Sequence, residues 1–133
     1  MNTGRLTIAI YLRVSDEDKD MERAAKRESD SIANQRNLLR GFLRGVPEAG
    51  KADILEFCDD GCSGKNFDRP SVRALLKRAE QGEIYCIVVK DFSRFGRDYL
   101  TVGNYIFRIF PFWGVRFISV NDGFDSAARR ESD

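Results

Sequence analysis

Histidine is absent from this chain of 133 residues, and cysteine, proline and tryptophan are scarce, with three, three and one copies. The lack of histidine excludes the Ser-His-Asp arrangement and most acid–base chemistry that depends on an imidazole. Neither sign of charge dominates, because 22 lysines and arginines stand against 21 aspartates and glutamates, for a net charge of +1. The overall charge therefore points to no particular class of partner.

Long apolar runs are missing too. Residues 105–120 form the most apolar stretch, but two arginines and a proline interrupt it, so it is too short and too charged to span a bilayer. No secretory leader is visible, and we therefore expect a cytoplasmic protein without a membrane segment. The odd number of cysteines indicates reduced thiols, and Cys58 and Cys62 have no second ligand pair, so we expect no metal site.

Short apolar runs alternate with amphipathic segments along the chain. Four runs have the length and composition of buried strands and lie at residues 6–12, 53–58, 84–89 and 115–120. Three segments with apolar side chains at helical spacing lie between them, at residues 31–44, 70–82 and 98–110. This order predicts an α/β fold, with a mostly parallel, open sheet in three layers and right-handed crossovers.

Polar residues gather where the first three of these runs end. Since open α/β sheets bind their ligands at the carboxyl ends of the strands, we expect these residues to share one edge. The candidates are Arg13, Ser15, Asp60, Ser63, Lys90, Ser93, Arg94 and Arg97. Hydroxyl groups beside guanidinium groups, which bind phosphate oxygens in pairs, favour an anionic, phosphate-bearing substrate and neither a metal nor a small-molecule cofactor.

Four segments resemble, in order, the motifs of the serine recombinase (resolvase/invertase) catalytic domain. They are YLRVS at residues 11–15, DGCSG and DRP within residues 60–70, KDFSRFGR at residues 90–97 and VRFISVNDG at residues 115–123. The likeness runs from residue 6 to residue 125. The charged segment before Ser31 resembles the large branch of the family, which is carried by transposons and phages.

This resemblance implies a resolvase-like catalytic domain at residues 1–125 and the beginning of a connecting segment, leading to further regions, at residues 126–133. It implies that the partner is DNA and that the full-length protein forms a homodimer or tetramer. The implied activity is site-specific DNA recombination of the kind found in transposons and other mobile elements, and DNA integration, excision and inversion all stay open.

The resemblance also implies roles for single residues. Ser15 would be the nucleophile that attacks a DNA phosphodiester and forms a covalent 5′-phosphoserine intermediate. Strand exchange and religation would follow without ATP. Arg13, Arg94 and Arg97 would surround the scissile phosphate. A hydroxyl group is a weak nucleophile unless its alkoxide is stabilised, and guanidinium groups can supply that stabilisation.

Supporting roles follow in the same way. Arg69 would bind or orient the phosphate, and Gln35 would support the site. Ser93 stands where the family often has aspartate, so the resemblance implies no proton relay at that position. The base that deprotonates Ser15 stays open among a carboxylate such as Asp60, a neighbouring phosphate and water.

The residues alone leave other interpretations open. Ser15, followed by three acidic residues, is also a suitable helix N-cap, and the spacing of Arg94 and Arg97 is typical of a solvated helix face. Gln35 has the position of an ordinary surface residue on a helix. The fold would also suit a non-catalytic DNA-binding or assembly module, whereas a phosphate-ester hydrolase or receiver-like domain would need metal-binding acids where Arg13 and Ser15 stand.

Overall fold

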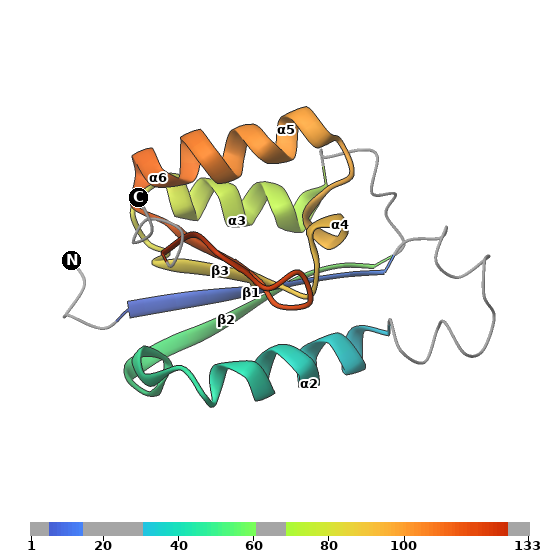
Figure 1. The fold of residues 1–133 in the computed structure, drawn as a ribbon, viewed down its shortest axis with the longest axis vertical. Helices are drawn as coiled ribbons and strands as arrows, with labels where there is room; N and C mark the ends of the chain where they lie inside the picture. The colour runs from blue at the N-terminus through green and yellow to red at the C-terminus, as the bar shows by residue number, and fades with distance from the viewer. Residues whose placement is uncertain (1–5, 15–30, 61–68, 128–133) are drawn as a thin grey trace.

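The computed structural model describes residues 6–14, 31–60 and 69–127. Within them, one sheet contains the strands in the order β2-β1-β3-β4-β5 (Figure 1). The strands are β1 (Leu6–Val14), β2 (Ala52–Asp60), β3 (Cys86–Val89), β4 (Arg116–Ser119) and β5 (Phe124–Asp125). All neighbouring pairs are parallel except β4 and β5, which are antiparallel. The prediction of a mostly parallel α/β sheet is confirmed.

Helices cover both faces of this sheet and complete the three layers (Figure 1). One face is covered by α2 (Ile32–Leu43), which leads into the short 3-10 helix η1 (Pro47–Lys51). The other face is covered by α3 (Pro70–Glu80) and by a longer helical segment. That segment consists of α5 (Tyr99–Asn104), the π-helix η2 (Tyr105–Ile109) and α6 (Phe110–Trp113). A single-turn helix, α4 (Phe92–Phe95), follows β3.

Burial of the central strand β1 on both faces explains why its sequence is apolar at nearly every position. Ile8, Ile10 and Leu12 pack into the core beneath α2, whereas Ala9 and Tyr11 belong to the core on the opposite face. Since successive side chains of a strand point to opposite faces, burial on both sides requires apolar residues at nearly every position. Each fully buried isoleucine or leucine contributes roughly 1.5–3 kcal/mol to folding.

The helical segment predicted at residues 98–110 differs from the structure at its end. Helical residues continue past Pro111 to Trp113, and Gly114, with a φ of 76°, ends them in the left-handed conformation. Before Pro111 the chain widens into the π-helix, in which the amide of Phe110 donates to the carbonyl of Tyr105. This change of register precedes a proline that has no amide to donate, which is a common cause of irregular helix geometry.

Three elements were not predicted at all, the 3-10 helix η1, α4 and the two-residue strand β5, because each is too short to show a periodic pattern. Among the helices that the described residues form, none is long and apolar enough to cross a membrane.

Candidate active site

The carboxyl ends of β1, β2 and β3 meet at one edge of the sheet. Arg13 pairs in register with Asp59, and Val14 pairs with Asp60, so the first two strands end side by side. α4 begins three residues after β3 ends and contacts β1. Ser15, the residue after Val14, and Ser63 lie outside the described residues. Of Asp60, the last residue of β2, only the backbone is described.

Three arginine side chains are buried at this edge. Arg13, Arg69 and Arg94 are 0%, 1% and 5% exposed, respectively. Burial, together with the nearby charges of Arg69 and Arg94, lowers the pKa of Arg13 to about 10. The Arg13 guanidinium nevertheless stays charged at neutral pH, so the edge concentrates positive charge in a region that water reaches poorly.

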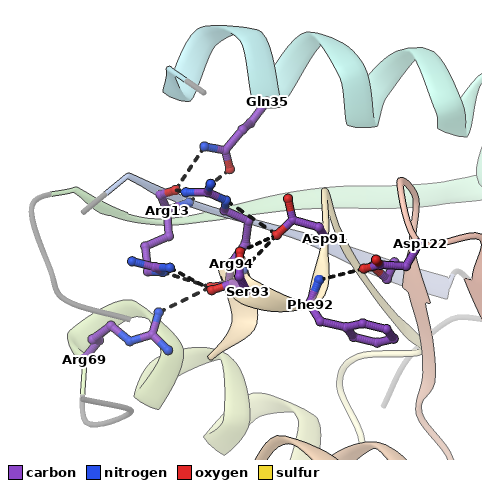
Figure 2. Close-up of polar contacts among 9 residues, drawn as sticks. Arg13, Gln35, Arg69, Asp91, Phe92, Ser93, Arg94 and Asp122 are labelled. Carbon is purple, nitrogen blue, oxygen red and sulfur yellow. Dashed lines mark hydrogen bonds and ion pairs between the residues drawn. The ribbon is translucent and has the colours of Figure 1, made fainter. Parts of the chain in front are cut away.

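Arg13 and Arg69 are held by backbone carbonyl groups at the C-terminal end of α4 (Figure 2). The Arg13 guanidinium donates to the carbonyls of Ser93 (2.7 Å) and Arg94 (3.1 Å). Arg69 also donates to the carbonyl of Arg94, at 3.4 Å, and to that of Phe95. The last carbonyls of a helix carry partial negative charge and lack helical partners, so they suit buried cations. Both arginines therefore fix the position of α4.

Arg94 reaches from α4 back to the end of β1, where Gln35 joins it (Figure 2). The Arg94 guanidinium donates to the carbonyl of Arg13 at 2.9 Å. Gln35 donates from its amide nitrogen to the same carbonyl, at 2.9 Å, and accepts from the Arg13 amide, at 3.2 Å. Gln35 is fully buried, so its interpretation as an ordinary surface residue is wrong. These bonds tie α2, β1 and α4 together one residue before β1 ends.

The remaining predicted residues lie around this centre. Ser93 is partly buried, and its hydroxyl group donates to the carboxylate of Asp91 at 2.6 Å. Arg97 is exposed just after α4, and its charge contributes to the lowering of the Arg13 pKa. Lys90 is half-buried between β3 and α4. The structure thus brings Arg13, Gln35, Arg69, Ser93 and Arg94 together and places Lys90 and Arg97 at the margin.

Sequence reasoning missed two buried residues of this edge, Tyr11 and Asp59. The Tyr11 hydroxyl group accepts a bond from Arg69 (2.5 Å) and donates to the carboxylate of Asp59 (2.7 Å). Burial raises the pKa of Tyr11 above its ordinary value, so the phenol keeps its proton. Asp59 also accepts from the amides of Ser71 (3.0 Å) and Val72 (3.1 Å) in the first turn of α3.

A signal for Asp59 was present in the sequence. Arg69 precedes Pro70 at the start of α3 and makes no side-chain cap of its own. The free amides of a helix start need an acceptor, and when the cap position cannot supply one, an acidic residue elsewhere is expected to do so. The acceptor is Asp59, ten residues before Arg69.

The sheet order, the three layers and this arginine-rich edge together define an α/β catalytic domain of resolvase-like fold. The family model "Resolvase, N terminal domain" matches residues 8–132. The chain therefore belongs to the resolvase family of serine recombinases and corresponds to the catalytic domain of that family.

Individual relatives agree with this assignment. The chain is 34% identical over 90 residues to the Bacillus subtilis (strain 168) protein named "Putative DNA recombinase"; the match covers 68% of this chain and 16% of that protein. This chain therefore spans about a sixth of the length of the Bacillus subtilis protein. The N-terminal catalytic domain of TP901-1 integrase has a similar fold, with a TM-score of 0.74, 22% identity, and coverage of 91% of this chain and 82% of that chain.

A resolvase family site-specific recombinase from Streptococcus pneumoniae is similar as well. The TM-score is 0.67 at 25% identity, and the match covers 92% of this chain and 77% of that chain. These comparisons confirm the family and the fold that the motifs indicated. The roles of Ser15 and of the arginines stay predictions.

Proposed function

We propose that this domain cuts and rejoins DNA in site-specific recombination, with Ser15 as the nucleophile. The observation that carries the proposal is the buried cluster of Arg13, Arg69 and Arg94 at the end of β1, two residues before Ser15 in the chain. Clustered guanidinium groups in a poorly hydrated place bind an anion strongly, and a DNA phosphodiester is the anion on which this family acts.

The reaction is a pair of transesterifications. The Ser15 hydroxyl oxygen attacks phosphorus, the bond from phosphorus to the 3′ oxygen breaks, and the 3′ oxygen leaves as a hydroxyl group with the proton that Ser15 gives up. The 5′ phosphate is then bonded to Ser15. A 3′ hydroxyl group from the partner strand attacks this phosphoserine, restores a phosphodiester and returns the proton to the serine. The number of phosphoester bonds is conserved, so no nucleotide triphosphate is consumed.

The arginines divide the remaining work. Three arginines surround the phosphate and stabilise the charge that develops on its oxygens, namely Arg13, Arg94 and Arg97. Each can stabilise the transition state by up to about 3 kcal/mol. Arg69 orients this group through its bonds to the carbonyls of α4. Gln35 keeps the end of β1 in register with Arg94.

The assembly and domain arrangement are part of the same proposal. Two copies are needed to cut both strands of a site, and two sites must meet for exchange, so the full-length protein acts as a homodimer and then a tetramer. Residues 1–125 form the catalytic domain, and residues 126–133 begin the connection to the regions that choose the DNA site.

The test is to trap the covalent intermediate. The full-length protein is incubated with randomly nicked genomic DNA from its source organism, quenched with detergent and separated on a denaturing gel. We expect a protein–DNA adduct whose nuclease-resistant peptide contains Ser15 bonded to a 5′ phosphate. Ser15→Ala should abolish the adduct, and the control Ser29→Ala should keep it. An adduct that survives Ser15→Ala contradicts the nucleophile, and DNA binding with no adduct from the wild type supports an assembly module instead.

A further inference from the structure

The single-turn helix α4 carries Ser93 and Arg94 but cannot hold its own shape. One turn of helix fixes several dihedral angles for very few hydrogen bonds and is unstable by itself. Its C-terminal end is held by Arg13 and Arg69 through the carbonyls described above. The position of Arg94 therefore depends on what holds the other end.

That end is held by Asp122, from the turn between β4 and β5 (Figure 2). The amide of Phe92 donates to one carboxylate oxygen of Asp122 at 2.9 Å. The buried hydroxyl group of Ser119 donates to the same oxygen at 2.6 Å and so fixes the direction of the carboxylate. The backbone of the turn is also bonded to the segment before α4, because the amide of Asn121 donates to the carbonyl of Lys90 at 2.8 Å.

The side chain of Phe92 is fixed by the same region. Its ring stacks on Phe117 in β4, with centroids 6.3 Å apart, and contacts Phe124 in β5, with centroids 5.5 Å apart. The first residue of α4 is thus held by its amide and by its ring. Asp91, the residue before α4, caps the helix, because both its carboxylate and its carbonyl accept from the amide of Arg94.

We infer that Asp122 is a positioning residue for DNA cleavage, which it supports by holding α4 so that Arg94 faces the end of β1. This inference rests on the proposed function. Asp122 is exposed and touches neither Arg13 nor Arg94 in any bond described above, so it acts through the backbone of α4. Its effect on folding should be small, whereas a guanidinium displaced by about 1 Å can slow a reaction roughly a hundredfold.

The variants separate positioning from stability. Asp122→Ala removes the acceptor. Asp122→Asn keeps one carbonyl oxygen that can accept from both Phe92 and Ser119. The control Asn121→Ala alters the same exposed turn and leaves the carboxylate of Asp122 in place. The full-length protein is used with a nicked duplex whose sequence is recovered from the wild-type adduct. The rate of adduct formation at saturating DNA, the apparent Kd for that duplex and the Tm are measured.

We expect Asp122→Ala to form the adduct about 10- to 100-fold more slowly, with an apparent Kd within about twofold of the wild type. The Tm should fall by no more than about 5 °C. Asp122→Asn and Asn121→Ala should keep rates within about threefold of the wild type.

Each other outcome is informative. A wild-type rate for Asp122→Ala overturns the positioning role alone, whereas a wild type that forms no adduct overturns the proposed function and this role with it. An Asp122→Asn variant as slow as Asp122→Ala overturns positioning through the hydrogen bonds, since only charge then matters. A slow rate that returns to normal when the assay is cooled well below the Tm marks Asp122 as merely structural and also overturns the role.

Discussion

The two ends of the sheet hold arginine in opposite ways. At the amino end of β4, the guanidinium of Arg116 donates to both carboxylate oxygens of Asp125, at 2.9 and 2.6 Å, and lies 3.6 Å from Glu48. At the carboxyl end of β1, Arg13 donates to backbone carbonyls and has Arg69 and Arg94 as neighbours. The hydrogen bond to Asp125 raises the pKa of Arg116, whereas burial lowers that of Arg13.

The two ends of the sheet therefore differ in how far the charge of their arginines is balanced. Around Arg116 the charges neutralise one another and fasten the short strand β5 to β4. The Arg13 guanidinium donates to carbonyl dipoles, which hold it in place without cancelling its charge, and the ion pair of Arg94 with Asp91, at 3.7 Å, offsets only part of the positive charge of the cluster. Under the proposed function, a phosphate would be attracted to the positive edge at the end of β1, whereas the carboxylates of Asp125 and Glu48 face the arginine at the other end.

Among the variants that test this difference, Arg94→Ala is expected to have the largest effect. Losing one preorganised donor to the transition state is expected to slow adduct formation about 100- to 1000-fold. The free energy of unfolding should change by less than about 1 kcal/mol, because the lost bond to the Arg13 carbonyl and the lost ion pair with Asp91 are offset by less repulsion among buried cations. Single-turnover gels and urea unfolding measure the two quantities. A large loss of stability would instead mark Arg94 as structural.

Replacing Asp59 with alanine tests how the positive edge is fastened to α3. The free energy of unfolding should fall by about 2–4 kcal/mol, because two amides of α3 and the buried Tyr11 hydroxyl group lose their acceptor. Urea unfolding followed by circular dichroism gives the value. Asp59→Asn, which keeps one acceptor oxygen, should lie between the variant and the wild type, and an alanine variant as stable as the wild type would contradict the linkage.

Arg116→Ala is the matched change at the other end of the sheet. We expect a loss of about 1–2 kcal/mol in the free energy of unfolding, since a partly buried, two-bond ion pair with Asp125 disappears. The rate of adduct formation per folded molecule should stay within about twofold of the wild type. A rate loss comparable to that of Arg94→Ala would remove the distinction between the two ends.

The smallest effect concerns pH. The pKa of Tyr11 is raised in the fold above its ordinary value of 10.0, so the unfolded chain loses this proton first. Stability from Tyr11 is thus fully present below pH 10 and declines as the pH rises above it, by about 1 kcal/mol at pH 11. Tyr11→Phe should lack this decline, and the stability gap between the two proteins should narrow from pH 9 to pH 11 in urea titrations.

Arg13 provides the opposite contribution. Its pKa is lowered in the fold, so its burial penalty is relieved as the pH rises above about 10. Both proteins contain Arg13, and this contribution therefore largely cancels in the comparison with Tyr11→Phe. A gap that stays constant up to pH 11 would show that the Tyr11 phenol titrates normally in the fold.

Local pattern was sufficient for most of the fold. The continuous apolar run of β1 and the helical spacing along α2 and α3 are properties of neighbouring residues, which is why these elements were predicted. The family motifs placed Arg13, Arg69 and Arg94 at strand or loop ends without any structure. Elements as short as α4 and β5 were missed because they owe their shape to distant partners such as Asp122 and Arg116.

By itself, the amino-acid sequence determined the α/β class, the order of strands and helices, and the family to which the motifs belong. Only the tertiary structure decided which polar groups meet. Tyr11 and Asp59 look ordinary along the chain, Gln35 was expected at the site only through the family resemblance, and Arg13 and Arg94 are 81 positions apart. The physical reason is that such bonds depend on strand register and on which face a side chain occupies, and a shift of one residue would turn each group away from its partner.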